Sequence, residues 1–358
     1  MSRVLAALSG GVDSSVAALR LQQEGHEVNA VTMKLFARED SGPNRPPSGG
    51  RDDLEYAREA ARRLGLEHQV VDFRDMFRQK VIDRFATAYA QGLTPNPCLD
   101  CNRHIKFGLL GDLAARMGCD FLATGHYVRR EFDARRGRWL LRTGRDQAKD
   151  QGYVLYGLTQ TQLARTLFPL GEMSKAEVRS LAAARGLVNA DKPDSQDICF
   201  IPDGDYASFL ERKLGLAAPP GDFIDREGRI LGRHRGLIRY TIGQRRGLGS
   251  FGRPLYVTGL DPIDNTVRLG PEEELFSSSA LLGEVNLISE EVLDRPLAAR
   301  VKIRYNSPTE PAVIEPHTDG LLVKFETPRK AVTPGQAAVF YQDDLVVGGG
   351  VILKPNCL

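Results

Sequence analysis

The stretch RVLAALSGGVDSSVAALRLQQEG, residues 3–25, decides the fold. Residues 3–8 form a short apolar run that predicts a buried strand, and residues 13–25 carry the apolar period of a helix that ends at Gly25. The next segment, EVNAVTMKLF (27–36), again has the pattern of a strand. This order of strand, glycine-containing loop, helix and strand indicates a β-α-β unit.

The same alternation continues through the first part of the chain. DDLEYAREAARRLG (52–65) predicts a helix closed by its last glycine, whereas EHQVVDF (67–73) and CDFLATGHY (119–127) predict further parallel strands. We therefore expect an α/β domain over residues 1–205, built on a doubly wound parallel sheet. Ligands of such sheets bind at the carboxyl ends of the strands.

The pattern changes near residue 205, where long helical periods give way to short strands separated by glycines. The predicted strands are LYVTGLD, NTVRLG, LLGEVNLIS, LAARVKIRY, AVIEPH, GLLVKFE, QAAVFYQDD and VVGGGVIL. We expect a small central β-containing domain over residues 206–274 and a C-terminal β module, a barrel or sandwich, over residues 275–358.

Composition limits the class of protein. The 358 residues are 42% hydrophobic, which suffices for two or three cores. No apolar run is long enough for a signal peptide or a membrane span, so we expect a soluble cytoplasmic protein with no membrane partner. Five unevenly spaced cysteines in a long chain indicate thiol or metal chemistry in a reducing compartment. The net charge of only +2 says little about a polyanionic partner.

The loop SGGVDSS (9–15) connects the first strand to the first helix. Gly10 and Gly11 allow a tight turn that brings backbone N–H groups against an anion, and the helix N-terminus adds the positive end of its dipole. Serine hydroxyls can donate to phosphate oxygens, and Asp13 can hold Mg²⁺ or cap the helix. The loop lacks the lysine of a Walker site and the spacing of a dinucleotide fingerprint. The alternative is a simple glycine turn with Asp13 or Ser14 as helix cap.

Two segments place cysteines among polar residues. TPNPCLDCNRHIKFG (94–108) holds Cys98 and Cys101, and DKPDSQDICFIPDGDY (191–206) holds Cys199. A metal site, a redox pair and a sulfur carrier are all open, and Cys199 alone is as consistent with a buried core cysteine. Zinc ranks last because a second C-x-x-C pair is absent from the sequence. We assign no role to Cys119 or Cys357.

The loop SGGVDSS resembles the PP-loop of the ATP pyrophosphatase superfamily, whose members split ATP between the α and β phosphates to adenylate a substrate. Together with further motifs, it is similar to the tRNA-specific 2-thiouridylase family over essentially the full length. The motifs are AVTMKLF, TPNPCLDCNRHIKFG, ATGHY, KDQGYVLYGL, PLGEMSKAEVR, SQDICFIP, YTIGQRRGLG and VKIRY.

The resemblance implies ATP-dependent 2-thiolation of the wobble uridine of tRNA, by adenylation of its C2 oxygen. It assigns ATP, with Mg²⁺, to the PP-loop and to two residues flanking the nucleoside. The implied ATP-binding residues are Ala7, Leu8, Ser9, Gly10, Gly11, Val12, Asp13, Ser14, Met33 and Gly125.

The resemblance also implies a sulfur route. The cysteine matching Cys199 receives a persulfide from a sulfur-relay protein or a cysteine desulfurase, and its sulfur displaces AMP. The cysteine matching Cys101 completes release, which leaves a disulfide between Cys101 and Cys199. Both thiols then need thiolate character, for which Arg103, Lys106 and the phosphate-binding helix end are candidate sources.

The chain departs from the family pattern at Cys98, where well-known members carry an aspartate proposed to assist acid–base chemistry at the target base. That role is then vacant or taken by Asp100. Cys98, Cys101 and Cys199 together are also the three-thiolate ligand set of related sulfur transferases that hold a 4Fe-4S cluster. The persulfide route and the cluster route both stay open at this point.

Two basic stretches predict an RNA-binding surface. Residues 226–253 carry a formal charge of +7 with Tyr240 and Phe251 among the arginines, and residues 129–149 add +5. A solvated basic face is the alternative. The resemblance names residues that contact the target base or the tRNA, and the target base has to flip out of its stack to react. These residues are Asn96, Pro97, Cys98, His126, Lys149, Asp150, Gln151, Arg304, Tyr305 and Gln336.

Two other classes of protein compete with this interpretation. A PP-loop ligase that forms amides on a small molecule needs neither paired thiols nor a basic module. A non-enzymatic RNA-binding protein leaves SGGVDSS and Cys199 without a use. AMP release that depends on tRNA separates the three classes.

Overall fold

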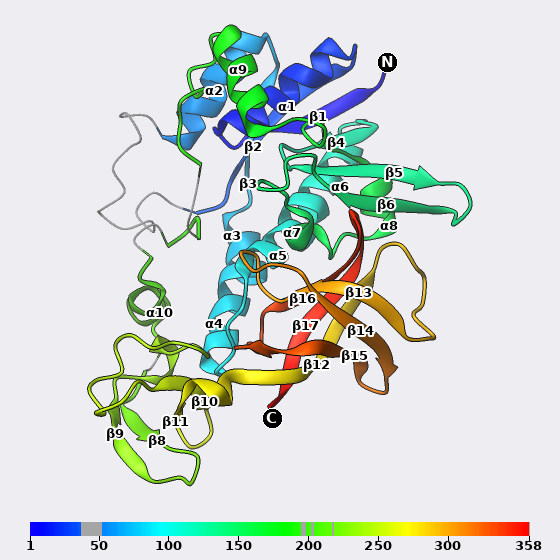
Figure 1. Cartoon of the computed structure of the whole chain (residues 1–358). Helices are drawn as coiled ribbons and strands as arrows, with labels where there is room; N and C mark the ends of the chain where they lie inside the picture. The colour runs from blue at the N-terminus through cyan, green and yellow to red at the C-terminus, as the bar shows by residue number, and fades with distance from the viewer. Residues whose placement is uncertain (37–51, 195–197, 202–203, 217, 358) are drawn as a thin grey trace.

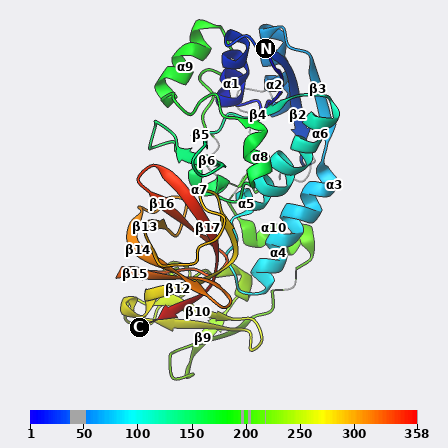
Figure 2. The same ribbon diagram turned by 90° about the vertical axis from the view of Figure 1, so that its right-hand side faces the viewer.

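The structure is a computed structural model that describes residues 1–36, 52–194, 198–201, 204–216 and 218–357. Figure 1 shows an α/β part that contains the N-terminus at the top, a β-barrel at the lower right and a small second sheet at the lower left. Figure 2, turned by 90°, shows the same stacking of the α/β part over the barrel. The chain therefore has the predicted fold class, an α/β sheet followed by two β parts.

The α/β part contains a five-stranded parallel sheet in the order β3-β2-β1-β4-β7. Val4 and Ala6 pack on one face, with Ala18 and Leu21 of the first helix, while Leu5 packs on the other face. This alternation follows from the two-residue period of a strand, and both faces are covered, as in other parallel sheets. The strands are β1 (Arg3–Ala7), β2 (Glu27–Lys34), β3 (His68–Asp72), β4 (Phe121–Ala123) and β7 (Thr166–Leu167).

Helices α1 (Val12–Gln23), α2 (Asp53–Leu64) and α9 (Lys175–Ala184) lie together beside the sheet, at the top of Figure 1. The predicted helix at 52–65 is confirmed. Its capping box pairs Asp52 with Glu55, and Gly65 ends it in the left-handed conformation with φ 64°. A second capping box, Ser174 with Glu177, begins α9.

Two continuous helical segments contain π-helical turns that were not predicted from the sequence. The first consists of α3 (Arg74–Phe77), η3 (Arg78–Ile82) and α4 (Asp83–Ala90). The second consists of α5 (Pro97–Asp100), η4 (Cys101–Leu109) and α6 (Leu110–Arg116). Both η3 and η4 are π-helices, which are rare and concentrate at functional sites. Three further helices complete the part, α7 (Gly152–Leu155), α8 (Gln160–Ala164) and α10 (Tyr206–Leu214).

The second sheet has the order β10-β11-β8-β9, and its parallel pair is β11 with β8. Its core contains Phe223, Tyr240 and Val267. The strands are β8 (Gly221–Ile224), β9 (Ile230–His234), β10 (Tyr256–Asp261) and β11 (Thr266–Gly270), with the 3₁₀ turns η5 (Leu237–Arg239) and η6 (Glu272–Leu275).

The C-terminal strands form a closed barrel, because β12 pairs with both β15 and β17. All the strands predicted beyond residue 280 are confirmed. The barrel consists of β12 (Phe276–Leu287), β13 (Leu297–Lys302), β14 (Glu310–His317), β15 (Gly320–Lys330), β16 (Ala337–Gln342) and β17 (Leu345–Cys357).

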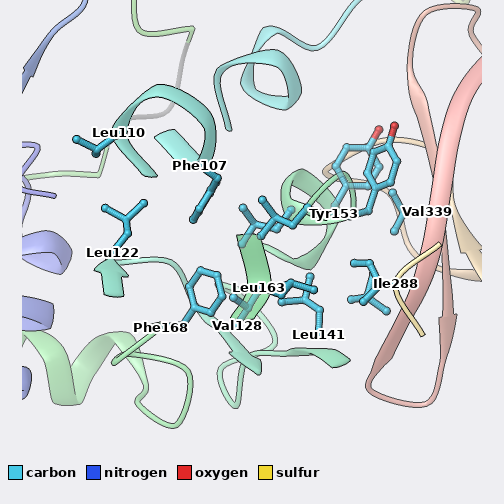
Figure 3. Close-up of a cluster of buried hydrophobic side chains, with 14 of the residues drawn as sticks. Phe107, Leu110, Leu122, Val128, Leu141, Tyr153, Leu163, Phe168, Ile288 and Val339 are labelled. Atoms are coloured by element: carbon cyan, nitrogen blue, oxygen red, sulfur yellow. The ribbon is translucent and has the colours of Figure 1, made fainter. Parts of the chain in front are cut away.

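A hairpin from the α/β part, β5 (Val128–Asp133) and β6 (Arg138–Thr143), extends the barrel sheet through β17. One hydrophobic core consequently runs from Leu122 of β4 in the parallel sheet to Ile288 and Val339 of the barrel (Figure 3). The α/β part and the barrel thus share a core, a feature that the sequence did not indicate. Among the described residues, no helix is long and apolar enough to cross a membrane.

Candidate functional site

The PP-loop lies between the end of β1 and the start of α1. Gly10 has a φ of +78°, and a Cβ there would lie 2.1 Å from the backbone oxygen of Asp53, so only glycine fits. The Ser14 hydroxyl accepts from the Ser9 N–H (3.1 Å) and donates to the Gly11 oxygen (3.0 Å). The N-cap residue of α1 is Gly11, and no side chain caps the helix; Asp13 therefore does not act as the cap.

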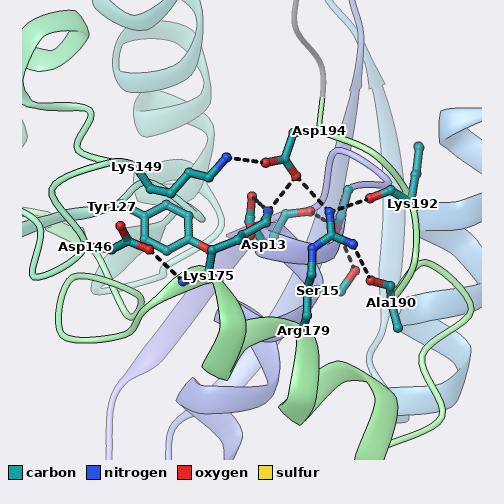
Figure 4. A network of polar contacts seen from close by, with 12 residues as sticks. Asp13, Ser15, Tyr127, Asp146, Lys149, Lys175, Arg179, Ala190, Lys192 and Asp194 are labelled. Atoms are coloured by element: carbon teal, nitrogen blue, oxygen red, sulfur yellow. Dashed lines mark hydrogen bonds and ion pairs between the residues drawn. The ribbon is translucent and has the colours of Figure 1, made fainter.

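Asp13 instead joins a network of charges at the mouth of the loop (Figure 4). Lys175 Nζ lies 2.7 and 2.8 Å from the two Asp13 carboxylate oxygens and 2.7 Å from Asp194. Tyr127 donates its hydroxyl to Asp13 over 2.7 Å, and Lys149 Nζ lies 2.8 Å from Asp194. Burial pushes the pKa of Asp194 up, but hydrogen bonds from the two lysines outweigh it and hold that pKa below its usual range.

A second group of donors holds the loop from the side of α2. Lys192 Nζ lies 2.6 Å from Asp53 and 3.2 Å from the Gly10 oxygen. Asn189 donates its amide to the same oxygen (3.2 Å) and to the Ser15 hydroxyl (3.0 Å). Lys175, Lys192 and Asn189 were not predicted as site residues. The Ser174–Glu177 capping box locates a helix start at Lys175, but no local pattern shows that this start faces Asp13.

The two residues predicted beside the nucleoside lie at the same edge of the sheet. Met33 is near the carboxyl end of β2, and Gly125 follows β4. A Cβ at Gly125 would lie 2.8 Å from the Ser14 nitrogen, so that backbone is in close contact with the PP-loop. Their roles stay predictions.

The three thiols come together from two segments far apart in sequence. Cys98 lies in α5, Cys101 begins η4, and Cys199 follows residues 195–197, which lie outside the described residues. Cys101 is buried, whereas the residues Cys98 and Cys199 keep exposed surface, although the surrounding protein desolvates their thiol groups. The pKa of Cys199 responds to Cys101, Cys98 and Lys106, which places these groups in one cluster. Cys98, Cys101, Cys199 and the half-buried Cys119 are free thiols.

Desolvation opposes the thiolate character that the resemblance requires of the thiols. Desolvation raises the pKa of Cys101 to about 11 and that of Cys199 to about 12, and it also raises the pKa of Cys98. Lys106 acts on all three in the expected direction but does not outweigh burial. Arg103, another of the expected sources, lies 3.6 Å from Glu284.

A lysine–histidine pair connects the thiols with the nucleotide loop. Lys106 Nζ lies 3.4 Å from His126 Nε2, and His126 Nδ1 lies 2.8 Å from the Thr124 hydroxyl. An ammonium group can only donate, so Nε2 accepts and Nδ1 carries the proton. Burial and then Lys106 hold the pKa of His126 well below its usual value, so the ring is neutral. His126 therefore has no free ring nitrogen for the predicted tRNA contact in this conformation.

The predicted tRNA-contact segment 149–151 also has internal partners. Lys149 binds Asp194, and Asp150 accepts from the Gly144 and Gly152 N–H groups. The Gln151 side chain accepts from the Tyr127 N–H over 3.0 Å. These contacts shape the loop that holds the PP-loop network.

The other predicted contacts lie near the barrel. Arg304 donates to the Lys330 and Ala331 oxygens, while Tyr305 is 36% exposed and packs against Tyr153 with ring centroids 6.0 Å apart. Two more residues have structural contacts, because Asn96 accepts from the Cys98 N–H as the N-cap of α5 and Gln336 donates to the Thr94 oxygen. Pro97 is buried at the first position of α5. Whether these residues touch RNA stays a prediction.

The two basic stretches differ in how free their charges are. In 129–149 most of the cations have acidic or carbonyl partners; for example, Arg129 and Arg142 both pair with Asp344 over 2.7 and 2.6 Å. In 226–253 we find no ion pair for five exposed arginines among the described residues: Arg226, Arg235, Arg245, Arg246 and Arg253. Tyr240, which lies among these arginines in the sequence, is only 4% exposed and packs in the core of the second sheet.

The donor groups do not fit a resident metal. The described residues contain no group of three or more His, Cys, Asp or Glu side chains that could hold one. The cluster alternative is not favoured. Both Asp13 oxygens already bind Lys175, which leaves no preformed Mg²⁺ site there.

Comparison with known proteins covers nearly the whole chain. Family models described as the tRNA methyl transferase HUP domain, the tRNA methyl transferase PRC-barrel domain and the aminomethyltransferase beta-barrel domain match residues 2–203, 207–271 and 277–352. A solved 4-thiouridine synthetase–RNA complex with bound ATP is similar at 17% identity, with a TM-score of 0.36, over 60% of this chain and 50% of that chain.

Curated relatives match end to end. The chain is 47% identical over 355 residues to the tRNA-specific 2-thiouridylase MnmA 1 of Thermoanaerobacter pseudethanolicus, with 98% of each chain covered. It is 44% identical over 354 residues to the tRNA-specific 2-thiouridylase MnmA of Clostridioides difficile, again with 98% of each covered. With this identity, coverage and domain order, the chain belongs to the tRNA-specific 2-thiouridylase family.

Proposed function

We propose that this protein is an ATP-dependent tRNA sulfurtransferase that replaces the C2 oxygen of the wobble uridine with sulfur. One observation carries the proposal beyond family membership. The thiol cluster and the PP-loop lie on either side of the pair Lys106 and His126, so a nucleotide and a sulfur carrier can reach the same base. We place the reaction in the cytoplasm, with tRNA as the macromolecular substrate.

The nucleotide step uses the charges around the PP-loop. We propose that the phosphates of ATP bind the loop N–H groups and the N-terminus of α1, and that Lys175 and Lys192 turn from Asp13 and Asp53 toward them. The C2 oxygen of uridine then attacks the α phosphorus, and pyrophosphate leaves. Mg²⁺ would enter on the phosphates of its ATP substrate, and no step is assigned to a resident ion.

The sulfur step uses two of the three thiols. We propose that a sulfur-relay protein or cysteine desulfurase loads Cys199 with a persulfide. Its terminal sulfur attacks C2 of the adenylated uridine, and AMP leaves with the C–O bonding electrons. Deprotonated Cys101 then attacks Cys199 Sγ, the S–S bond breaks, and its electrons stay on the sulfur bound to C2. The products are 2-thiouridine and a Cys101–Cys199 disulfide, which an external dithiol reduces.

Lys106 has a defined part in this scheme. Every sulfur nucleophile is an anion when it attacks, whereas desolvation raises the pKa of Cys101 and Cys199 and so opposes the thiolate. The Lys106 ammonium is the cation that reaches all three thiols, and it offsets part of that burial. Asp100 lies 3.2 Å from Arg84, so we leave the acid–base role of the family aspartate vacant.

The test is a reconstituted reaction. Purified protein, tRNA transcript, labelled ATP and a persulfide donor should release AMP and pyrophosphate only when tRNA is present, and nucleoside mass spectrometry should find 2-thiouridine. A transcript with cytidine at the wobble position is the matched control. AMP release without tRNA would favour the amide-forming ligase, and tRNA binding without AMP release would favour a binding protein.

A second arm separates the two sulfur routes. Protein purified without oxygen and stripped of iron should keep full activity with the persulfide donor. Activity that depends strictly on restored iron would overturn the persulfide scheme.

A further inference from the structure

The C-terminal barrel contacts the segment that carries Cys98 and Cys101. The connection between β15 and β16 forms hydrogen bonds with both the N–H and the carbonyl oxygen of Thr94. Thr94 N–H donates to the Pro334 oxygen over 2.9 Å, and Gln336 donates its side-chain amide to the Thr94 oxygen over 2.7 Å. The two segments are more than 240 residues apart in sequence, so the contact is purely tertiary.

The connection between β15 and β16 is itself hydrogen-bonded to strand β17 of the barrel. Gly335 N–H donates to the Ile352 oxygen (2.9 Å), and Ile352 N–H donates to the Gln336 oxygen (2.8 Å). A Cβ at Gly335 would lie 2.9 Å from the Thr94 nitrogen, so the two backbones are in direct contact. Because Ile352 belongs to β17, a rigid strand supports the loop from behind.

Only one residue separates Thr94 from the cap of the cysteine helix. The Asn96 side chain accepts from the Cys98 N–H over 3.0 Å and starts α5, and η4 continues from Cys101 without a break. A shift of Thr94 therefore moves the N-cap, and with it the first turn that holds Cys98.

A second barrel contact reaches this helix from β12. Glu284 of β12 lies 3.6 Å from Arg103 and 3.8 Å from Arg84. These are exposed pairs and contribute little energy by themselves. They do show that the barrel meets the cysteine helix at two places.

We propose that Gln336 is a positioning residue: it ties the C-terminal barrel to Thr94 and thereby sets the place of Cys98 and Cys101. The resemblance assigns Gln336 to tRNA contact, whereas in this structure its side-chain amide donates a hydrogen bond to the backbone oxygen of Thr94. The inference builds on the proposed function for the identity of the reaction, but the contact itself is a property of the folded chain. A barrel that is displaced by bound tRNA would then act on the thiols through this residue.

The experiment compares Gln336→Leu with Gln342→Leu. Gln342 is a matched control, because it also donates a barrel side-chain amide to a backbone oxygen, that of Ala298, over 3.2 Å and away from the cysteines. Hydrogen–deuterium exchange of peptides covering residues 94–103 should speed up about fivefold in Gln336→Leu and stay unchanged in Gln342→Leu. The measurement needs neither ATP nor tRNA, so it stands even if the proposed reaction fails.

Kinetics give the second readout. In single-turnover thiolation, Gln336→Leu should lower the rate severalfold with the Kd for tRNA unchanged, because the thiols are displaced and the RNA surface is not. Unchanged exchange together with weaker tRNA binding would overturn the proposal in favour of a direct RNA contact. If Gln336→Leu does not fold, Gln336→Asn, whose shorter side chain cannot reach Thr94, carries the same measurements.

Discussion

Lys175 holds two carboxylates at the mouth of the PP-loop, and replacing it tests the proposed ATP site. Its side chain is 12% exposed, between Asp13 at 30% and Asp194 at 25%. Lys175→Met keeps most of the apolar stem but removes the ammonium group. Asp13 then keeps Tyr127 as its partner, and Asp194 keeps Lys149.

The expected loss of stability is about 2 kcal/mol. A hydrogen bond to a charged group contributes about 1.5–3 kcal/mol, and stranding a fully buried charge costs about 3–5 kcal/mol. Here both carboxylates are partly exposed, and Asp194 keeps Arg179 as well as Lys149, so water and the remaining donors recover part of the loss. ATP affinity should fall at least tenfold, because a phosphate contact of similar strength is lost.

Stability is measured by denaturant unfolding and ATP affinity by calorimetry. Lys324→Met is the control, since Lys324 pairs with Glu315 over 2.7 Å on the barrel surface and should cost under about 0.5 kcal/mol. The pKa of Asp194 is lowered, so its contribution is present above the unfolded pKa and is lost as pH falls through the folded value. The stability gap between wild type and Lys175→Met should therefore shrink below about pH 4. Unchanged ATP affinity in a folded variant would refute the proposed movement of Lys175 to phosphate.

Three other predictions concern the thiols, the barrel and the RNA surface. Since the pKa of Cys199 is raised to about 12, its alkylation rate, followed by peptide mass spectrometry, should rise about tenfold per unit from pH 7 to pH 10; a plateau near neutrality would contradict this. Glu284→Gly relieves a left-handed backbone with φ 44° and removes the carboxylate that pairs with Arg103. The free energy of unfolding should therefore stay within about 1 kcal/mol of the wild-type value, while thiolation slows. Asp343→Gly, also at a left-handed position with φ 53°, is the control and should change neither quantity. Exchanging both Arg245 and Arg246 for Gln should weaken tRNA binding and lower its salt slope by about 1 to 2, and an unchanged slope would remove them from the interface.

The elements with strong local patterns were predictable from sequence. The first strand, loop and helix, the second helix and the barrel strands follow from apolar period, glycines and capping residues alone. The π-helical turns were not, because an extra residue in a helical turn leaves no mark in composition. The stretch CNRHIKFGL has a normal apolar face, yet it forms η4 and begins with Cys101.

The residues of the candidate site also fall into a predictable and an unpredictable group. SGGVDSS and the cysteines were predicted because their chemistry can be recognised from short local motifs. Lys175 and Lys192 were missed because Asp13 and Asp53, the carboxylates that they contact beside the PP-loop, lie 162 and 139 residues away. No window of sequence contains both members of either pair.

The basic residues of 129–149 show why charge alone misleads. Counted along the chain, they suggest an RNA footprint, yet Arg129 and Arg142 both bind Asp344, which is more than 200 residues away. A lysine or arginine that already pairs with a carboxylate must give up that pair before it can neutralise a phosphate, so its contribution to RNA binding is reduced. The exposed, unpaired arginines of 226–253 have no such cost within the described part of the chain. Electrostatic attraction for tRNA should therefore concentrate on the second sheet, while the hairpin β5–β6 uses its charge to fasten the α/β part to the barrel.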